Sequence, residues 1–134
     1  MIKILKRSHL LIFLTIVLSS CAATIDRPLH IAARNGDAEA IAPLIAKGSD
    51  VNNIGPYGMT PLIQATYYGF APTVRELLRN GADPNIQDDQ KKTALHYAAD
   101  LGRADIQKIL IESGANPAIE DIYGKTAEMY AVEE

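Results

Sequence analysis

The chain has 134 residues, with 13 Lys and Arg against 16 Asp and Glu, so its formal net charge at pH 7 is −3. An acidic chain without clustered basic residues is a poor match for a phosphate backbone, so no nucleic-acid partner is expected. The single cysteine, Cys21, excludes an internal disulfide bond.

The first twenty residues have the layout of a secretory signal peptide. Lys3, Lys6 and Arg7 give a basic start, and an apolar run follows from Leu10 to Leu18. That run is shorter than the roughly 20 apolar residues that cross a bilayer. We predict that residues 1–20 are removed, which leaves 10 basic and 16 acidic residues and a net charge of −6.

The sequence Leu-Ser-Ser-Cys at residues 18–21 resembles the lipobox of bacterial lipoproteins. The resemblance implies acylation of Cys21, a tether over residues 21–25, and a lipid-anchored protein that faces the periplasm. Ala22 after the cysteine resembles the signal for passage to the outer membrane. Five residues reach at most about 18 Å, so the folded domain is expected close to the membrane. Cleavage after Ala23, with Cys21 discarded, is the alternative.

A period of 33 residues runs through the rest of the chain. Three sets of markers share it: Gly36, Gly69 and Gly102; Gly48, Gly81 and Gly114; and Thr60, Thr93 and Thr126. The same register aligns three short segments: Arg27-Pro28-Leu29-His30, Thr60-Pro61-Leu62-Ile63 and Thr93-Ala94-Leu95-His96. Such a period indicates stacked structural repeats.

These segments, and the endings Gly-Ser-Asp, Gly-Ala-Asp and Gly-Ala-Asn that close the units, resemble the ankyrin repeat. The resemblance implies an all-α solenoid over residues 26–134, with three full repeats and a truncated fourth. The expected repeats cover about residues 26–52, 53–85, 86–118 and 119–134. No single repeat can bury its apolar stripe alone, so the stack is the folding unit.

Local signals agree with a helix, turn, helix unit. Pro28 and Pro61 suit the first turn of a helix, and Gly36, Gly69 and Gly102 suit its end. Apolar stripes predict the second helices: Ile41, Leu44 and Ile45; Val74, Leu77 and Leu78; and Ile106, Leu110 and Ile111.

Three residues depart from the repeat pattern. Pro43 predicts that its helix begins late or bends. Lys91 stands where Gly58 and Gly124 stand in the other loops, which predicts either a different turn or a positive φ. Gln107 replaces an expected Ile or Val.

The polar residues do not suggest catalysis. His30 and His96 are separated by Ile63 in the register, and the resemblance implies that they brace the backbone between repeats rather than bind a metal. The acidic pairs at 88–89, 120–121 and 133–134 are interpreted as solvated surface. No nucleophile with a nearby base and no phosphate loop is present. We predict no enzyme activity, cofactor or small-molecule substrate.

The resemblance implies that a protein partner binds at the loop tips and the first-helix face. The free positions there are Pro56, Tyr57, Met59, Tyr67, Tyr68, Asp89, Gln90, Lys92, Asp100, Leu101, Ile122, Tyr123 and Lys125. Tyrosine is enriched among residues that dominate binding energy. The predicted protein-binding face is Tyr57, Met59, Tyr67, Tyr68, Lys92, Leu101 and Tyr123. Packing between first helices is the alternative for the adjacent tyrosines of the second repeat, and Tyr97 and Tyr130 receive no role.

The sequence thus favours a membrane-anchored scaffold or adaptor of the bacterial cell envelope that binds a protein. The alternative is a periplasmic immunity or inhibitor protein that neutralises a toxic enzyme. A hydrolase or a metal-dependent enzyme is a third hypothesis, which no residue pattern supports.

Overall fold

The computed structural model describes residues 27–131. The predicted signal peptide, Cys21 and the tether over residues 21–25 lie outside the described residues, as does the acidic pair at 133–134. The described part consists of seven α-helices and one short 3-10 helix, without any strand. The predicted all-α class is confirmed.

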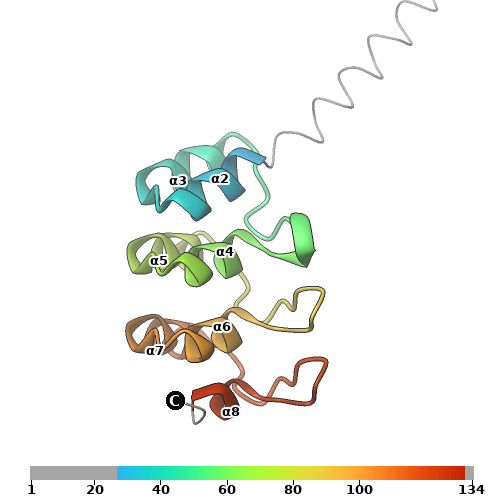
Figure 1. Ribbon diagram of the computed structural model, residues 1–134. Helices are drawn as coiled ribbons and strands as arrows, with labels where there is room; N and C mark the ends of the chain where they lie inside the picture. The colour runs from blue at the N-terminus through green and yellow to red at the C-terminus, as the bar shows by residue number, and fades with distance from the viewer. Residues whose placement is uncertain (1–26, 132–134) are drawn as a thin grey trace, which may run out of the picture.

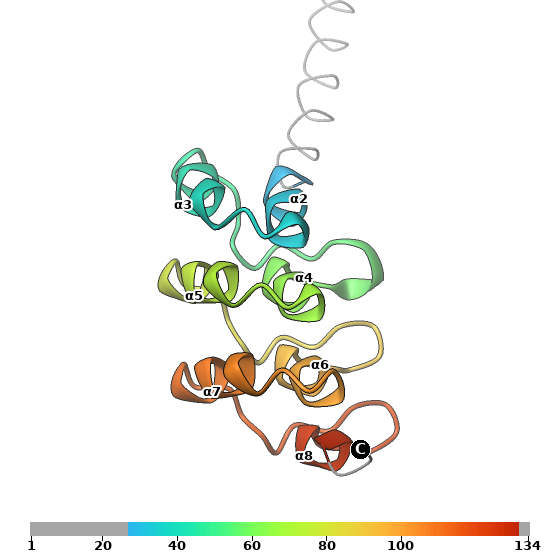
Figure 2. The same cartoon turned by 60° about the vertical axis from the view of Figure 1, so that its left-hand side comes forward.

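The helices form two rows (Figure 1). The inner row contains the first helix of each repeat: α2 (Arg27–Asn35), α4 (Pro61–Tyr68), α6 (Ala94–Asp100) and α8 (Ala127–Ala131). The outer row contains the second helices: α3 (Ala38–Ala46), α5 (Ala71–Arg79) and α7 (Ala104–Glu112). Each helix packs on its neighbours in the same row, and each first helix of a complete pair packs on its second (Figure 2).

Three long loops lead from an outer helix to the next inner helix, and they project from one edge of the stack (Figure 1). We call them the second, third and fourth loops after the repeats that they open; they cover residues 47–60, 80–93 and 113–126. The second loop contains the 3-10 helix η1 (Pro56–Gly58).

The ends of α4 show why these segments are helical. The Thr60 hydroxyl accepts a hydrogen bond from the backbone N–H of Ile63 at 3.2 Å, and Pro61 occupies the first helical position, where its missing N–H needs no partner. Gly69 then ends the helix with φ 83°, in the left-handed region that glycine adopts readily. Gly36 and Gly102 have φ of 75° and 65°, so the predicted helix ends are confirmed.

The core lies between the two rows and runs without interruption through the stack. Its largest fully buried apolar side chains are Leu29, Ile41, Leu62, Ile63, Val74, Leu77, Ile106 and Leu110. Fully burying one such side chain contributes about 1.5–3 kcal/mol. The stack is therefore stabilised by contacts between neighbouring repeats.

One apolar residue of the predicted stripes is outside this core. Ile111 is 54% exposed, whereas Leu78, one repeat earlier, packs against the core beside α7. On the side of α7 that packs against α5, the apolar residue is Ile109. No described helix follows α7 in the outer row, so Ile111 is not covered. The prediction that Ile111 is a core residue is wrong.

Of the two outcomes that Pro43 predicted for the second helix of the first repeat, a late start or a bend, the late start is not observed. Helix α3 begins at Ala38, and Pro43 lies within it on an exposed position. The Asp37 carboxylate accepts a hydrogen bond from the Ala40 N–H at 3.2 Å and fixes this start. A proline removes one intrahelical hydrogen bond, and burial of Ile41 holds the helix in place despite that loss.

Candidate protein-binding surface

Two histidines fasten the inner helices to the following loop. His30 Nε2 lies 3.2 Å from the Met59 carbonyl oxygen, and His96 Nε2 lies 3.0 Å from the Lys125 carbonyl oxygen. At His96, Nδ1 accepts the Thr93 N–H at 3.1 Å, so the proton is on Nε2, which donates to the carbonyl. The predicted bracing role of both histidines is confirmed.

The third loop is organised by a buried carboxylate. Asp88 is 7% exposed, and its Oδ1 accepts hydrogen bonds from the N–H groups of Gln90 at 2.8 Å and Lys92 at 3.0 Å. Its Oδ2 accepts a 2.5 Å hydrogen bond from the Tyr97 hydroxyl. Burial, and then the hydrogen bond to Asp88, raise the pKa of Tyr97 above its ordinary value.

The fourth loop repeats this arrangement 33 residues later. Asp121 is 5% exposed and accepts hydrogen bonds from the N–H groups of Tyr123 at 2.8 Å and Lys125 at 3.0 Å, and from the Tyr130 hydroxyl. Burial alone would raise the pKa of this carboxyl, but these hydrogen bonds lower it below its usual value. The interpretation of both acids as solvated surface is wrong, because each one closes its own loop.

The tyrosines that received no role from the sequence are therefore structural. Tyr97 is buried and Tyr130 is half-buried. The ammonium group of Lys92 lies 5.4 Å from the ring centroid of Tyr97 and 4.7 Å from that of Tyr130. Both distances allow cation–π attraction. The Lys92 side chain is therefore held against the stack, which leaves it less available to a partner than the predicted binding role implied.

The second loop is built differently, because Gly55 replaces the buried aspartate. A Cβ atom at position 55 would lie 2.6 Å from His30 Nε2. The second loop lacks the carboxylate bonds and retains the backbone bonds that close all three loops: the Gly58 N–H donates to the Gly55 carbonyl at 3.2 Å, as the Lys91 N–H donates to the Asp88 carbonyl at 2.9 Å. This turn places Tyr57 at φ 60° and ψ 19°, a left-handed conformation that is strained for a non-glycine residue.

Lys91 has the equivalent strain in the third loop, with φ 57°. Of the two predicted outcomes for this position, the positive φ is the one observed. At Gln107, the third departure from the repeat pattern, Nε2 donates to the Ala98 carbonyl at 3.2 Å. A hydrogen bond thus stands where an Ile or Val would make an apolar contact.

The positions of the predicted binding face differ in exposure. Tyr57 is 78% and Tyr123 is 71% exposed, at the tips of the second and fourth loops. Met59 is half-buried and packs against the core. The remaining tip positions Pro56, Asp89, Gln90 and Ile122 are exposed as well. Three exposed apolar residues that the sequence did not single out are Ile31, Ile54 and Met129.

Three exposed side chains lie at the ends of inner helices, and we call Tyr67, Tyr68 and Leu101 the inner shelf. The rings of the two tyrosines meet edge to face at a centroid distance of 5.2 Å. Tyr67 also meets Tyr97 edge to face at 5.8 Å. Leu101, at the end of α6, is the repeat equivalent of Tyr68 at the end of α4. The ring contacts hold the two tyrosines in place while leaving them accessible.

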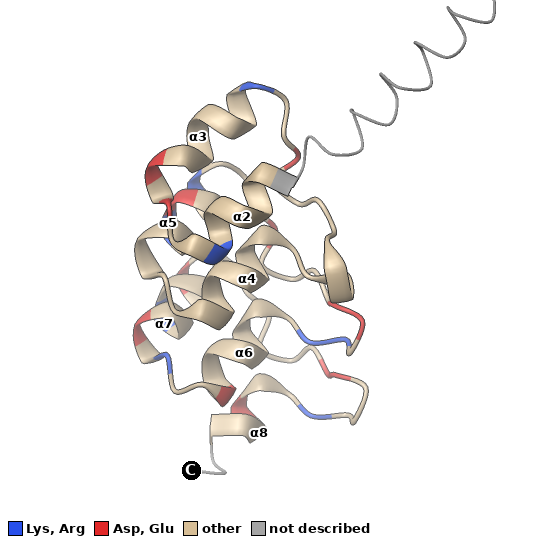
Figure 3. Cartoon of the chain, turned by 45° about the horizontal axis from the view of Figure 1, so that its top comes forward, with Lys and Arg blue, Asp and Glu red and all other residues tan. Residues whose placement is uncertain are grey.

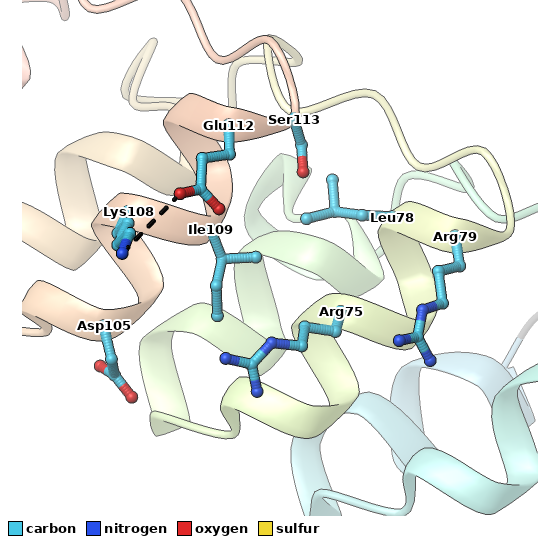
Figure 4. A pocket seen from close by; sticks show the side chains of 8 residues that line it. All are labelled: Arg75, Leu78, Arg79, Asp105, Lys108, Ile109, Glu112 and Ser113. Atoms are coloured by element: carbon cyan, nitrogen blue, oxygen red, sulfur yellow. Dashed lines mark ion pairs between the residues drawn. The ribbon is translucent and has the colours of Figure 1, made fainter.

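A groove of about 480 Å³ lies on the outer row, between α5 and α7 (Figure 4). Leu78 and Ile109 are its apolar residues, and Lys108 pairs with Glu112 at 3.9 Å. The other lining residues are Arg75, Arg79, Asp105 and Ser113. Charges of both signs alternate along it, and none of the predicted binding positions lines it.

The described residues contain no arrangement suited to metal binding. Between residues 27 and 131, no three His, Cys, Asp or Glu side chains cluster as metal ligands would. The same part of the chain has no helix long and apolar enough to cross a bilayer. The inner shelf and the loop tips offer aromatic and apolar contact, together with the hydrogen-bonding hydroxyl groups of their tyrosines.

A family model for three copies of the ankyrin repeat matches residues 5–88 and residues 68–134. These matches span more than half of the chain, which therefore belongs to the ankyrin repeat family, and the fold is an ankyrin solenoid. Members of this family typically act as non-enzymatic modules for protein–protein interaction. No curated protein matches the chain significantly.

Proposed function

We propose that this protein is a membrane-anchored interaction scaffold of the bacterial cell envelope, which binds a protein partner through the inner shelf and the tip of the fourth loop. The observation that carries the proposal is a set of three exposed tyrosines, two at the end of α4 and one at the tip of the fourth loop. Tyr67, Tyr68 and Tyr123 are all exposed, and none of them is needed to fill the core.

These side chains suit a binding site because tyrosine combines a large apolar area with one hydrogen-bonding group. The ordering of two shelf tyrosines by ring contacts lowers the entropy that binding would otherwise cost. Hot-spot residues of this kind each contribute more than about 1 kcal/mol to affinity.

The anchor in this proposal is a lipid on Cys21. It is supported by the basic start, the short apolar run and the Leu-Ser-Ser-Cys sequence at residues 18–21. The side chain that follows the cysteine, that of Ala22, favours the periplasmic face of the outer membrane as the location. The described fold begins at Arg27, so at most a few residues separate the lipid from the first helix.

The binding surface is tested by comparing two triple variants. A photoreactive residue at position 68 first identifies the partner in intact cells. The purified partner is then titrated with the shelf variant Tyr67→Ser, Tyr68→Ser, Leu101→Ser and with the groove variant Arg75→Ser, Arg79→Ser, Lys108→Ser. We expect the shelf variant to lose about tenfold in affinity or more, while the groove variant binds as the unaltered protein does. The opposite result would contradict the assignment.

The anchor is tested separately in cells supplied with labelled palmitate. Label should appear on the protein and disappear in Cys21→Ala. A protein that carries no label would remove the anchor from the proposal and leave the binding surface unaffected.

A further inference from the structure

We propose that the tip of the second loop, formed by Ile54, Pro56 and Tyr57, rests in the headgroup region of a lipid bilayer. This inference rests on the proposed lipid anchor and goes beyond it, because it assigns a second membrane contact to the folded domain. It also separates Tyr57 from the protein-binding surface.

The first observation is the charge of the second repeat. Residues 51–74, which include the tip of the second loop and all of α4, contain no Asp, Glu, Lys, Arg or His, although Lys47 and Asp50 are exposed at the start of the loop. By contrast, Asp89 and Lys91 are exposed on the third loop, and Glu120 is exposed on the fourth. In Figure 3 the segment that carries η1, and α4 after it, have no charge colour, whereas the corresponding parts of the third and fourth loops carry both colours. The side chains of the tip therefore carry no charge that would have to leave water, although the Asp89 N–H of the third loop donates to the Tyr57 carbonyl at 3.1 Å and brings one exposed carboxylate beside the tip.

The second observation is what the tip exposes. Ile54 is 63% and Tyr57 is 78% exposed, and Pro56 is exposed between them. Packing does not require an apolar residue at position 54, since the equivalents of Ile54 in the next two loops are Gln87 and Glu120. Tyrosine is enriched at membrane–water interfaces, where its ring sits at the level of the headgroups.

The third observation is that several backbone N–H groups around the tip are already hydrogen-bonded. The Gly55 N–H donates to the Met59 carbonyl at 2.9 Å, and the Gly58 and Met59 N–H groups donate within the loop at 3.2 Å each. Pro56 has no N–H to satisfy. A loop that enters a region poor in water loses less when its backbone N–H groups have partners within the protein, as those of Gly55, Gly58 and Met59 do.

The fourth observation is the distance from the anchor. The second loop packs on His30, in the first turn of α2, through Gly55 and the Met59 carbonyl. The chain from Cys21 to Arg27 spans at most about 22 Å. Packed helices are about 8–10 Å apart, so the tip of the fourth loop lies roughly 20 Å further along the stack. An anchored protein would thus bring the second loop to the bilayer before the charged loops.

The test uses the absence of tryptophan from the chain. Tyr57→Trp places a single indole at the tip of the second loop, and Tyr123→Trp is the matched control at the equivalent position of the fourth loop. The full lipidated proteins are purified and incorporated into phosphatidylcholine vesicles, with and without brominated acyl chains. We expect blue-shifted emission that brominated lipid quenches in Tyr57→Trp, and unshifted, unquenched emission in Tyr123→Trp. Adding Ile54→Ser to Tyr57→Trp should reduce the quenching.

Vesicle flotation reports the anchor independently. Protein that floats with the vesicles while Tyr57→Trp stays unquenched overturns bilayer docking and leaves the anchor intact. Protein that does not float overturns both. Equal quenching of the two variants overturns the preference for the second loop. A blue shift that requires native envelope membranes, or that grows with the ratio of protein to lipid, identifies a protein partner or a second copy as the occupant and also overturns the proposal.

Discussion

The second loop and the two loops that follow it occupy equivalent places in the stack, but their tips are held by different means. In the third and fourth loops, Asp88 and Asp121 close the turn with buried carboxylates that bind two backbone N–H groups and a tyrosine hydroxyl. In the second loop, Gly55 offers no side chain, so the turn has only backbone bonds, most of which the other two loops share, and Tyr57 takes a left-handed conformation.

This difference shows how a repeat protein can specialise one loop without altering its stack. Each repeat contacts only its neighbours. Helix α4, which follows the second loop, packs on α2 on one side and on α6 on the other (Figure 2). The replacement of an aspartate by Gly55 removes a charge and a hydrogen-bond centre while the bond from His30 to the Met59 carbonyl still fastens the loop. The result is an uncharged tip on an unchanged scaffold.

The largest expected effect comes from the core, on which both kinds of loop depend. Leu77→Ala should lower the free energy of unfolding by about 2–5 kcal/mol, because Leu77 is fully buried and its truncation leaves a cavity. Ile111→Ala is the control, since Ile111 is largely exposed and should cost less than about 1 kcal/mol. Chemical denaturation monitored by circular dichroism measures both. Equal losses would contradict the assigned core.

The carboxylate of the third loop gives the next largest effect. Asp88→Ala should cost about 1.5–3 kcal/mol, since two N–H groups and the Tyr97 hydroxyl lose a charged acceptor. Asp89→Ala, at the exposed neighbouring position, should change stability by about 0.5 kcal/mol or less. If the two variants unfolded at the same denaturant concentration, the loops would not differ in the way described.

The fourth loop should respond to acid. Because the folded state lowers the pKa of Asp121 below its ordinary value of 3.8, the carboxylate stabilises the fold above about pH 4, and this contribution is lost as the pH falls toward the folded pKa. The melting temperature of Asp121→Asn should therefore fall less between about pH 4 and pH 2 than that of the unaltered protein. Parallel melting curves over that range would argue against a charged, hydrogen-bonded Asp121.

The smallest expected effect is a gain in stability at the strained residues. Lys91→Gly should stabilise the fold by about 0.5–1 kcal/mol, because glycine adopts the φ of 57° without the left-handed penalty. Tyr57→Gly, at φ 60°, should give a similar gain. Thermal unfolding measures both, and a loss of stability in Tyr57→Gly would show that the exposed ring contributes to the fold.

The features that recur with the period were predictable from the sequence. The glycine and proline positions and the helical class follow from local backbone chemistry that recurs in the repeats, whereas the bracing role of His30 and His96 was implied by the resemblance to the ankyrin repeat. The family match agrees with that prediction.

The features that depend on contacts between distant side chains were not predictable. Adjacent acids in a loop suggest solvated surface, and only the tyrosine nine residues later decides that Asp88 and Asp121 are buried. A recurring Asp, Lys and Tyr at one register in the third and fourth repeats was the available signal. The exposure of Ile111 depends on which helices flank α7, which an apolar stripe does not report.

The most direct test of the account compares the two loop tips in intact cells. A diazirine-bearing residue is placed at position 57 or at position 123, and the crosslinked products are identified by mass spectrometry. Adducts to a protein from position 123 and adducts to lipid from position 57 are the predicted result. Protein adducts from position 57 together with none from position 123 would contradict the division of the stack into a membrane-facing loop and a partner-binding face.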